Sequence, residues 1–184
     1  MVEFQIYESV YKSEMLGDIT VASDGKNIVG LWLSGQKYFE ATIEGTTKSG
    51  DELPVIKKTK KWLDSYFAGE NPPISDLPLA PNGSTFRKRV WKKLCAIAYG
   101  QTRTYGDIAA ELAREDGKTR MSAQAVGGAV GHNPISIIIP CHRVVGANGN
   151  LTGYAGGIDK KIYLLKHEGA YTQNMFAPKT GTAL

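Results

Sequence analysis

The most reactive side chains of this sequence lie next to one another in the run Pro140-Cys141-His142-Arg143. Cysteine is a soft nucleophile in its thiolate form, and a neighbouring base or cation raises the fraction of thiol that is ionised. Adjacent residues point to opposite faces of a strand and do not face each other on a helix. A working couple of Cys141 and His142 therefore needs a turn or a bridging water, and the rigid ring of Pro140 is able to supply such a turn.

A catalytic base works better when a third group holds it in place. Glu168, in the run His167-Glu168-Gly169, is the candidate carboxylate for orienting His142. Taken singly, His142 and Glu168 are each also compatible with an ordinary solvated surface position, because a lone titratable residue is weak evidence of a site.

The second cysteine, Cys95, falls on an apolar helical spacing and is predicted to be a buried core thiol. Two cysteines are too few for a disulfide scaffold or for a cysteine-based zinc site. A reduced, cytoplasmic setting is therefore expected.

The elements that must position these residues are predicted to be short. Ser84 is a helix N-cap for residues 85–100, whose apolar stripe includes Val90 and Leu94. Helices over 105–114 and over 123–133, the latter capped by Ser122, are joined by a glycine-containing turn and indicate a helix-turn-helix. The following elements are a buried strand over 135–140, a glycine-rich loop over 148–157, a helix capped by Asp159 and ended by Gly169, and a tail over 170–184 without clear periodicity.

Two adjacent glycines, Gly127 and Gly128, lie inside one of these predicted helices. Each costs about 1 kcal/mol relative to alanine, so something must approach the helix backbone closely. A packed neighbouring helix and a nucleic-acid groove both satisfy that requirement, and the dipeptide does not distinguish them.

The first half of the chain is predicted to be a small α/β unit. Residues 4–10 and 18–35 alternate as strands do, with Asp24-Gly25 marking a hairpin turn. Residues 53–67 show helical spacing, and a proline-rich linker extends to residue 83. The length of 184 residues fits one large domain or two small ones, and the 42% hydrophobic content is typical of a folded chain.

The charge is distributed unevenly along the chain. Residues 1–80 carry 8 Lys against 12 Asp and Glu, a net −4, whereas residues 81–184 carry 14 Lys and Arg against 6 Asp and Glu, a net +8. A basic half indicates a polyanionic partner such as nucleic acid, although a solvated surface explains the charge equally well. No apolar run reaches the roughly 18 residues of a membrane span, and Glu3 stands where a secretory signal would carry basic charge.

The stretch from Tyr105 to Gly169 closely resembles the O6-alkylguanine-DNA alkyltransferases. The resemblance is strongest over about residues 84–169 and rests on GQTRTYGDIAAELA, on SAQAVGGAVGHNPISIIIPCHRVVGANGNLTGYAGGIDKK and on LLKHEG. The core IPCHRV, with an NP dipeptide upstream and GYAGG downstream, is a highly specific signature.

This resemblance implies an α+β fold with two domains and a tail. An N-terminal ribonuclease H-like α/β domain with a linker would occupy residues 1–80. A winged-helix-like DNA-binding alkyltransferase domain would occupy residues 81–169, followed by the tail over 170–184. The N-terminal half contains no Cys and no His, so the zinc site of some relatives cannot be built there, and neither a metal nor a cofactor is expected.

The resemblance also implies roles for individual residues. Cys141 accepts the alkyl group as a thioether, His142 is the water-bridged base and Glu168 orients it. Asn133 is the hinge asparagine, and Tyr105 crowds the DNA backbone and hydrogen-bonds the guanine. The residues expected to contact the base or the DNA are Tyr154, Lys161, Gln124, Ala125, Gly127, Gly128, Ala129 and Arg143.

The implied partner is double-stranded DNA that contains O6-alkylguanine, with O4-alkylthymine as a second candidate lesion. The protein is expected to be a monomer without membrane contact. Because the O6 alkyl group lies within the duplex, the nucleotide must be flipped into a pocket. A thioether is not cleaved by any group of the motif, so each molecule is expected to act once.

One position departs from the family. Many members carry arginine where this chain has Gln124, and that arginine fills the gap left by the flipped base. Gln124 is shorter and neutral, and Arg120 lies one turn earlier. The flipping step therefore depends on which residue of this chain fills the gap.

Two other classes of function remain open from the residues alone. A Cys-His hydrolase would use Cys141 and His142 with an oxyanion hole and repeated turnover. A non-catalytic winged-helix DNA binder would explain the basic half, but it would not explain the PCHR run beside a glycine-rich loop.

Overall fold

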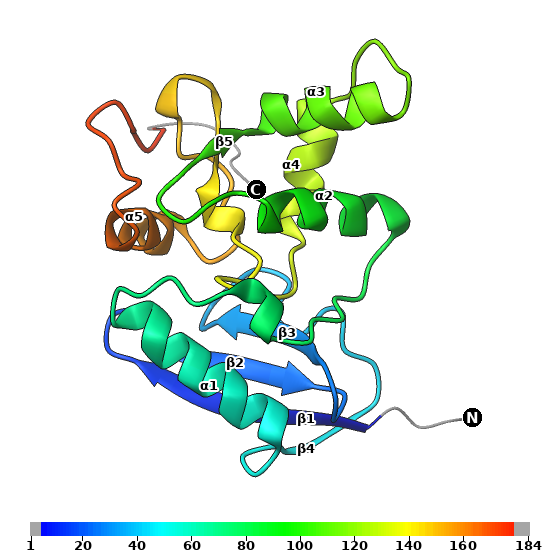
Figure 1. Ribbon diagram of the computed structural model, residues 1–184, viewed down its shortest axis with the longest axis vertical. Helices are drawn as coiled ribbons and strands as arrows, with labels where there is room; N and C mark the ends of the chain where they lie inside the picture. Colours follow the sequence, from blue (N-terminus) through cyan, green and yellow to red (C-terminus); the bar gives the residue numbers. More distant parts are fainter. Residues whose placement is uncertain (1–4, 179–184) are drawn as a thin grey trace. The chain divides into compact units, whose positions relative to one another are not determined.

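A computed structural model describes residues 5–178 (Figure 1). Residues 1–4, which include Glu3, and residues 179–184 lie outside the described residues. The chain divides into two compact units. One takes in the chain up to Gly83 together with Pro134–Ile138, and the other comprises Ser84–Asn133 and the chain from Ile139 onward.

The first unit contains a four-stranded sheet in the order β3-β2-β1-β4. Strands β1 (Gln5–Ser13), β2 (Gly17–Ser23) and β3 (Ile28–Leu33) are antiparallel neighbours, and the short edge strand β4 (Thr46–Ser49) runs parallel to β1. The predicted hairpin turn is confirmed. Asp24 Oδ1 accepts hydrogen bonds from the amides of Lys26 and Asn27, and Gly25 supplies the positive φ of 97°.

Helix α1 (Pro54–Phe67) lies across one face of this sheet, as Figure 1 shows, and confirms the helix predicted there. Proline at its first turn is favourable because the missing N–H has no helical partner there. Its buried face includes Ile56, Trp62 and Leu63, which pack toward the sheet. A short 3₁₀ turn, η1 (Ile74–Asp76), follows.

The segment Pro134–Ile138 corrects the strand that was predicted over 135–140. Only Ile135 makes a β-bridge, to Leu31. Ile137 has a φ of 69°, which is unusual for a β-branched residue, and the Ile138 amide donates to the Ser136 carbonyl at 2.8 Å. The apolar run is buried as expected, but these tight turns prevent it from extending as a strand.

The second unit is mainly helical, so the described chain confirms the α+β class. Its elements are α2 (Thr85–Cys95), β5 (Arg103–Thr104), α3 (Tyr105–Glu115), α4 (Ala123–Gly131), η2 (Cys141–Arg143), β6 (Val144–Val145), η3 (Ala147–Gly149) and α5 (Ile158–His167). The helix-turn-helix interpretation of α3 and α4 stays a prediction. No helix within residues 5–178 is long and apolar enough to cross a membrane.

The helix starts in this unit follow local sequence signals. Ser84 and Ser122 accept hydrogen bonds from the amides three residues on, as predicted, and Thr104 forms an unpredicted capping box with Asp107. Three details of the prediction are wrong. Helix α2 ends at Cys95, which is half-buried rather than a core residue, and α5 has Gly157 rather than Asp159 as its N-cap.

Candidate functional site

A tight turn at Pro140 places the nucleophile. The amide of Cys141 donates to the Ile139 carbonyl at 2.8 Å across Pro140, and Cys141 begins the 3₁₀ turn η2. The predicted turn between Cys141 and His142 is therefore present, and the two side chains do not alternate as they would on a strand. Cys141 is buried, with 5% of its surface exposed.

Asn133 fixes the position of the Cys141 side chain. Its Nδ2 donates to the Ile139 carbonyl at 2.8 Å and lies 3.2 Å from the Cys141 Sγ. The chain leaves the second unit after Asn133 and returns to it at Ile139. One buried amide thus joins the two ends of this excursion and also contacts the thiol.

The environment of Cys141 holds the thiol in its protonated form until a base acts on it. Burial raises the pKa of Cys141, while the hydrogen bond from Asn133 and the charge of Lys161 oppose that rise. A thiol in this state is unreactive unless a proton acceptor lies within reach.

His142 and Glu168 form the pair that was predicted to supply this acceptor. The distance from His142 Nε2 to Glu168 Oε1 is 2.7 Å, and both side chains are fully buried. Burial alone would raise the pKa of Glu168, but the hydrogen bonds from His142 and Arg143 hold it far below its usual value. The ionised carboxylate therefore accepts the Nε2 proton of His142.

This hydrogen bond defines which ring nitrogen of His142 is basic. Burial lowers the pKa of His142, so the ring is neutral. With its proton on Nε2, the ring presents a bare Nδ1, which is buried and has no hydrogen-bond partner among the described residues. The arrangement leaves a proton acceptor on the residue next to the thiol.

Arg143 was predicted to contact the base or the DNA, and the structure gives its guanidinium partners within the protein. It donates from Nε to Glu168 Oε2 at 2.8 Å, from Nη2 to Glu168 Oε1 at 3.0 Å, and from Nη1 to the Ile97 carbonyl at 2.6 Å. Only 6% of its surface is exposed. Arg143 therefore holds Glu168 in place and is not available to a phosphate.

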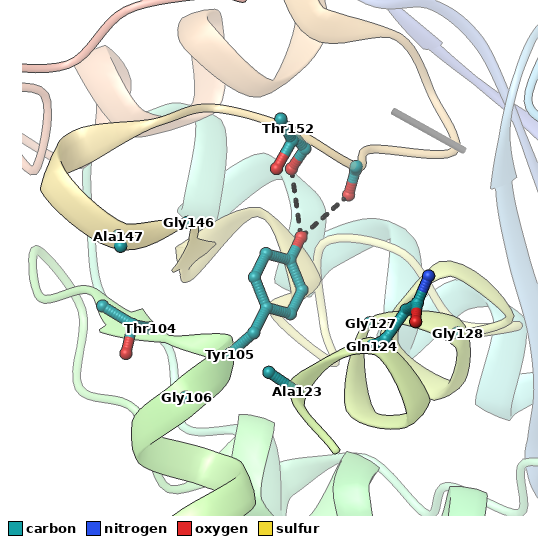
Figure 2. Close-up of a pocket in the computed structure, with 11 residues that line it drawn as sticks. Thr104, Tyr105, Gly106, Ala123, Gln124, Gly127, Gly128, Gly146, Ala147 and Thr152 are labelled. Atoms are coloured by element: carbon teal, nitrogen blue, oxygen red, sulfur yellow. Dashed lines mark hydrogen bonds between the residues drawn. The ribbon is translucent and has the colours of Figure 1, made fainter. Parts of the chain in front are cut away.

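A pocket of about 500 Å³ lies between the glycine-rich loop and helices α3 and α4 (Figure 2). Tyr105, the first residue of α3, stands at its centre, and its hydroxyl group donates to the carbonyls of Thr152 and Gly153, at 3.1 Å each. Burial raises the pKa of Tyr105, and the charge of a Cys141 thiolate raises it further. Tyr105 is thus a neutral hydrogen-bond donor close to Cys141.

Two more predicted residues lie buried around Cys141. Lys161 is buried next to the glycine-rich loop that lines the pocket, here called the pocket loop, and its Nζ donates to the carbonyls of Val144 at 2.6 Å and Thr152 at 3.1 Å. Burial lowers its pKa to about 8. With this pKa Lys161 is still mostly protonated at neutral pH, and its charge acts on the Cys141 sulfur. The hydroxyl group of Tyr154 is buried without a partner in the described part of the chain, and the charge of Cys141 adds to the burial that raises its pKa.

The outer face of α4 carries the remaining predicted contacts. Gln124 and Ala125 are exposed, and Gly127 and Gly128 line the pocket. Ala129 does not share this face: it is 3% exposed, and its carbonyl accepts the Trp91 indole N–H at 2.8 Å. The structure therefore places Ala129 on the buried side of α4, away from the pocket face.

The structure distinguishes the two explanations for the glycine pair. A Cβ built on Gly128 would meet nothing within 4 Å, and one on Gly127 would meet only the Tyr105 ring, at 3.8 Å. No neighbouring helix among the described residues requires these glycines. The close approach that they permit is instead available to a ligand in the pocket.

Sequence reasoning missed the part of the loop that builds the pocket wall. Gly146, Ala147, Thr152 and Gly153 line the pocket, and Thr152 and Gly153 accept hydrogen bonds through their main-chain carbonyls. Backbone acceptors leave no side-chain signature, so the only available signal was the density of glycine over residues 146–157.

Comparison with known families covers both units of the chain. A model of the 6-O-methylguanine DNA methyltransferase DNA binding domain matches residues 85–170, and a model of the ribonuclease-like domain of the same family matches residues 6–81. The methylated-DNA–protein-cysteine methyltransferase of Haemophilus influenzae is 38% identical over 163 residues, which are 89% of this chain and 86% of that protein.

Other relatives support the same relationship. The methylated-DNA–protein-cysteine methyltransferase of Methanosarcina barkeri is 44% identical over 154 residues, covering 83% of this chain and 91% of that protein. The crystal structure of Mycobacterium tuberculosis OGT in complex with DNA matches with a TM-score of 0.74 at 38% identity, covering 90% of this chain and 93% of that chain.

Proposed function

The chain belongs to the 6-O-methylguanine DNA methyltransferase family, and from this membership we propose that Cys141 is the residue that receives the alkyl group of O6-alkylguanine from double-stranded DNA. Its activity is methylated-DNA–protein-cysteine methyl transfer, a DNA repair reaction. The observation that carries the assignment to Cys141 is the buried thiol held by Asn133 next to the base His142, which Glu168 orients.

The proposed reaction begins with ionisation of the thiol. The bare Nδ1 of His142 takes the Cys141 proton through a water molecule, and Glu168 stabilises the resulting imidazolium. Lys161 stabilises the thiolate through its charge. The thiolate then attacks the alkyl carbon, so that an S–C bond forms as the C–O6 bond breaks.

The leaving group is guanine, which departs with the electron pair of the broken bond. A donor at the edge of the base stabilises this developing negative charge, and the neutral Tyr105 hydroxyl group is the candidate. Tyr154 would pack against the alkylated base. The guanine anion then takes up one proton from solvent, protonated His142 returns its extra proton to solvent, and Cys141 remains as a thioether.

Two further features of the proposal concern the approach of the DNA. The lesion is flipped out of the duplex into the pocket, with Gln124, Ala125, Gly127 and Gly128 on the DNA side. Thiol, imidazole and carboxylate groups do not cleave a thioether at neutral pH, so each molecule acts once. We expect a monomer acting in the cytoplasm, where reducing conditions keep Cys141 a thiol, with O4-alkylthymine as a second candidate lesion.

The test is intact-mass measurement after exposure to a duplex that contains one O6-methylguanine. The expected result is a permanent gain of one methylene mass, located on Cys141 by peptide mapping. Cys95→Ser is the matched control and should still gain the mass. Cys141→Ser should gain none while still binding the duplex, because affinity comes mainly from phosphate contacts.

The other outcomes identify the alternatives. A Cys-His hydrolase would convert many equivalents of substrate and return to its original mass. A binding protein without chemistry would retain both the duplex and its own mass unchanged. Alkylation of Cys95 in place of Cys141 would contradict the assignment directly.

A further inference from the structure

The chain beyond α5 contacts the loop that forms one wall of the pocket. The amide of Phe176 donates to the Gly149 carbonyl at 3.1 Å, and the Leu151 amide donates to the Phe176 carbonyl at 2.9 Å. These two hydrogen bonds bracket Asn150, which forms a parallel β-bridge with Phe176. The tail, which shows no periodicity in the sequence, is thus paired with the glycine-rich loop over residues 149–151.

Apolar packing joins the same two segments. Met175 is 8% exposed and belongs to a core cluster that also contains Leu151, which is fully buried. The remaining buried members of the cluster are Val145, Leu165 and Ala170. Contact at Gly149 is close enough that a Cβ there would lie 2.6 Å from the Asn174 carbonyl oxygen. Glycine at this position, with a φ of 79°, is therefore required by the approach of the tail.

The opposite side of this loop faces the reacting groups. One residue after Leu151, the carbonyl of Thr152 accepts hydrogen bonds from Tyr105 and from Lys161. Thr152 and Gly153 line the pocket, and Tyr154 follows them. The loop is consequently held at two places: Tyr105 and Lys161 donate to the Thr152 carbonyl, and the tail pairs with the main chain of residues 149–151.

We propose that residues 170–178, here called the C-terminal segment, position the pocket loop and thereby determine how closely the pocket fits the alkyl group. This proposal rests on the proposed function of Cys141. The segment begins at the last residue of the match to the DNA binding domain, and its residues act through the loop without touching the substrate. Gly149, Met175 and Phe176 are its positioning residues.

A pair of substitutions at Phe176 separates the backbone contact from the side chain. Phe176→Pro removes the N–H that donates to Gly149, whereas Phe176→Ala keeps it and removes only a ring that is 49% exposed. In the proline variant, the Leu151 amide should exchange with solvent about tenfold faster, which is the scale of one backbone hydrogen bond. The alanine variant should match the parent.

The second readout compares the rates at which the protein accepts two alkyl groups of different size. In Phe176→Pro, transfer of methyl from duplex DNA should slow by about tenfold, the same hydrogen-bond scale. Transfer of benzyl from the same duplex carrying O6-benzylguanine should change by less than about twofold, because the larger group fills the room left by a loosened loop and its fit depends less on that hydrogen bond. Met175→Ala, which leaves a cavity beneath Leu151, should shift the ratio of the two rates in the same direction. This variant replaces Phe176→Pro in the experiment if the proline variant does not fold.

Specific outcomes would overturn the proposal. Equal slowing with both substrates and an unchanged Leu151 exchange rate would make the segment a general stabiliser. The same would follow if Phe176→Ala reproduced the proline effect. A parent protein that transfers no alkyl group would contradict the proposed function. The effect of the segment on the loop would still be measured, because exchange of the Leu151 amide needs no alkyl donor.

Discussion

Arg143 donates hydrogen bonds to both carboxylate oxygens of Glu168, with Nε 2.8 Å from Oε2 and Nη2 3.0 Å from Oε1. Because Glu168 in turn accepts the Nε2 proton of His142, the orientation of the base depends on this ion pair. Cys141, His142 and Arg143 are consecutive. A single turn of backbone therefore carries the nucleophile, its base and the anchor of the carboxylate that orients the base.

Removal of that anchor should destabilise the fold. Arg143→Ala leaves the Glu168 carboxylate buried without the side chain that contacts both of its oxygens, and breaking a buried pair in this way costs about 3 to 5 kcal/mol. Urea denaturation at pH 7 measures the loss. Lys88→Ala, on the exposed face of α2, is the control and should stay within about 0.5 kcal/mol of the parent. A loss below about 1 kcal/mol in Arg143→Ala would show that the pair contributes little.

The rate of transfer should depend on pH through Glu168. Burial raises the pKa of Cys141, so the thiolate fraction is low at neutral pH and grows as the pH rises. Glu168→Gln removes the charge that stabilises protonated His142, so the variant should be slowest relative to the parent near neutral pH. The deficit should narrow at alkaline pH, where solvent ionises the thiol. Single-turnover rates across the pH range provide the measurement, and a constant deficit would make Glu168 purely structural.

Tyr105→Phe should slow transfer without unfolding the protein. The substitution removes the hydroxyl donor but keeps the ring, and loss of one donor to a developing negative charge typically costs about 100-fold in rate. Single-turnover kinetics at saturating duplex DNA would measure it, with circular dichroism as the control for folding. An unchanged rate would mean that the hydroxyl group serves only to hold the Thr152 and Gly153 carbonyls.

Gly128→Ala should separate stability from DNA binding. A Cβ at this position meets nothing within 4 Å, so alanine should raise the free energy of unfolding by up to about 1 kcal/mol. The added methyl group projects at the pocket face and should weaken binding of a duplex that contains O6-methylguanine. Denaturation and fluorescence anisotropy measure the two effects. A more stable variant with undiminished affinity would show that the DNA does not approach this face.

Gln124→Arg should speed repair of duplex DNA. A flipped nucleotide leaves a gap whose unstacking costs a few kcal/mol, and an arginine plane fills more of that gap than glutamine does. Reaction with free O6-benzylguanine needs no flipping and should hardly change. Rates are compared at saturating DNA, because the added charge also raises affinity.

Gln124→Ala is the control for this experiment, and it should slow the duplex reaction alone. Should this variant match the parent on duplex DNA at saturation, Gln124 has no part in extrusion. Arg120, just before α4, then becomes the next candidate.

Much of the secondary structure follows from local sequence signals. Ser84 and Ser122 start their helices because a hydroxyl oxygen satisfies an amide three residues on, and Asp24-Gly25 forms its turn for an equally local reason. The run over 135–140 shows where such reasoning fails. Its β-branched residues favour a strand, but the chain turns there, with a positive φ at Ile137 and a hydrogen bond from the Ile138 amide to the Ser136 carbonyl.

The sequence by itself determined the nucleophile candidate, its neighbouring base and the carboxylate, because PCHR and HEG carry reactive side chains whose chemistry is independent of the fold. Only the tertiary structure decided what Arg143 and Lys161 do. From the sequence alone, a basic side chain is expected to lie on the surface. In the structure Arg143 donates to the Glu168 carboxylate, 25 residues away, and to the Ile97 carbonyl, and Lys161 donates to the Val144 carbonyl. Main-chain carbonyls occur at every position and leave no trace in the residue types, so the fold alone selects which of them meet a buried cation.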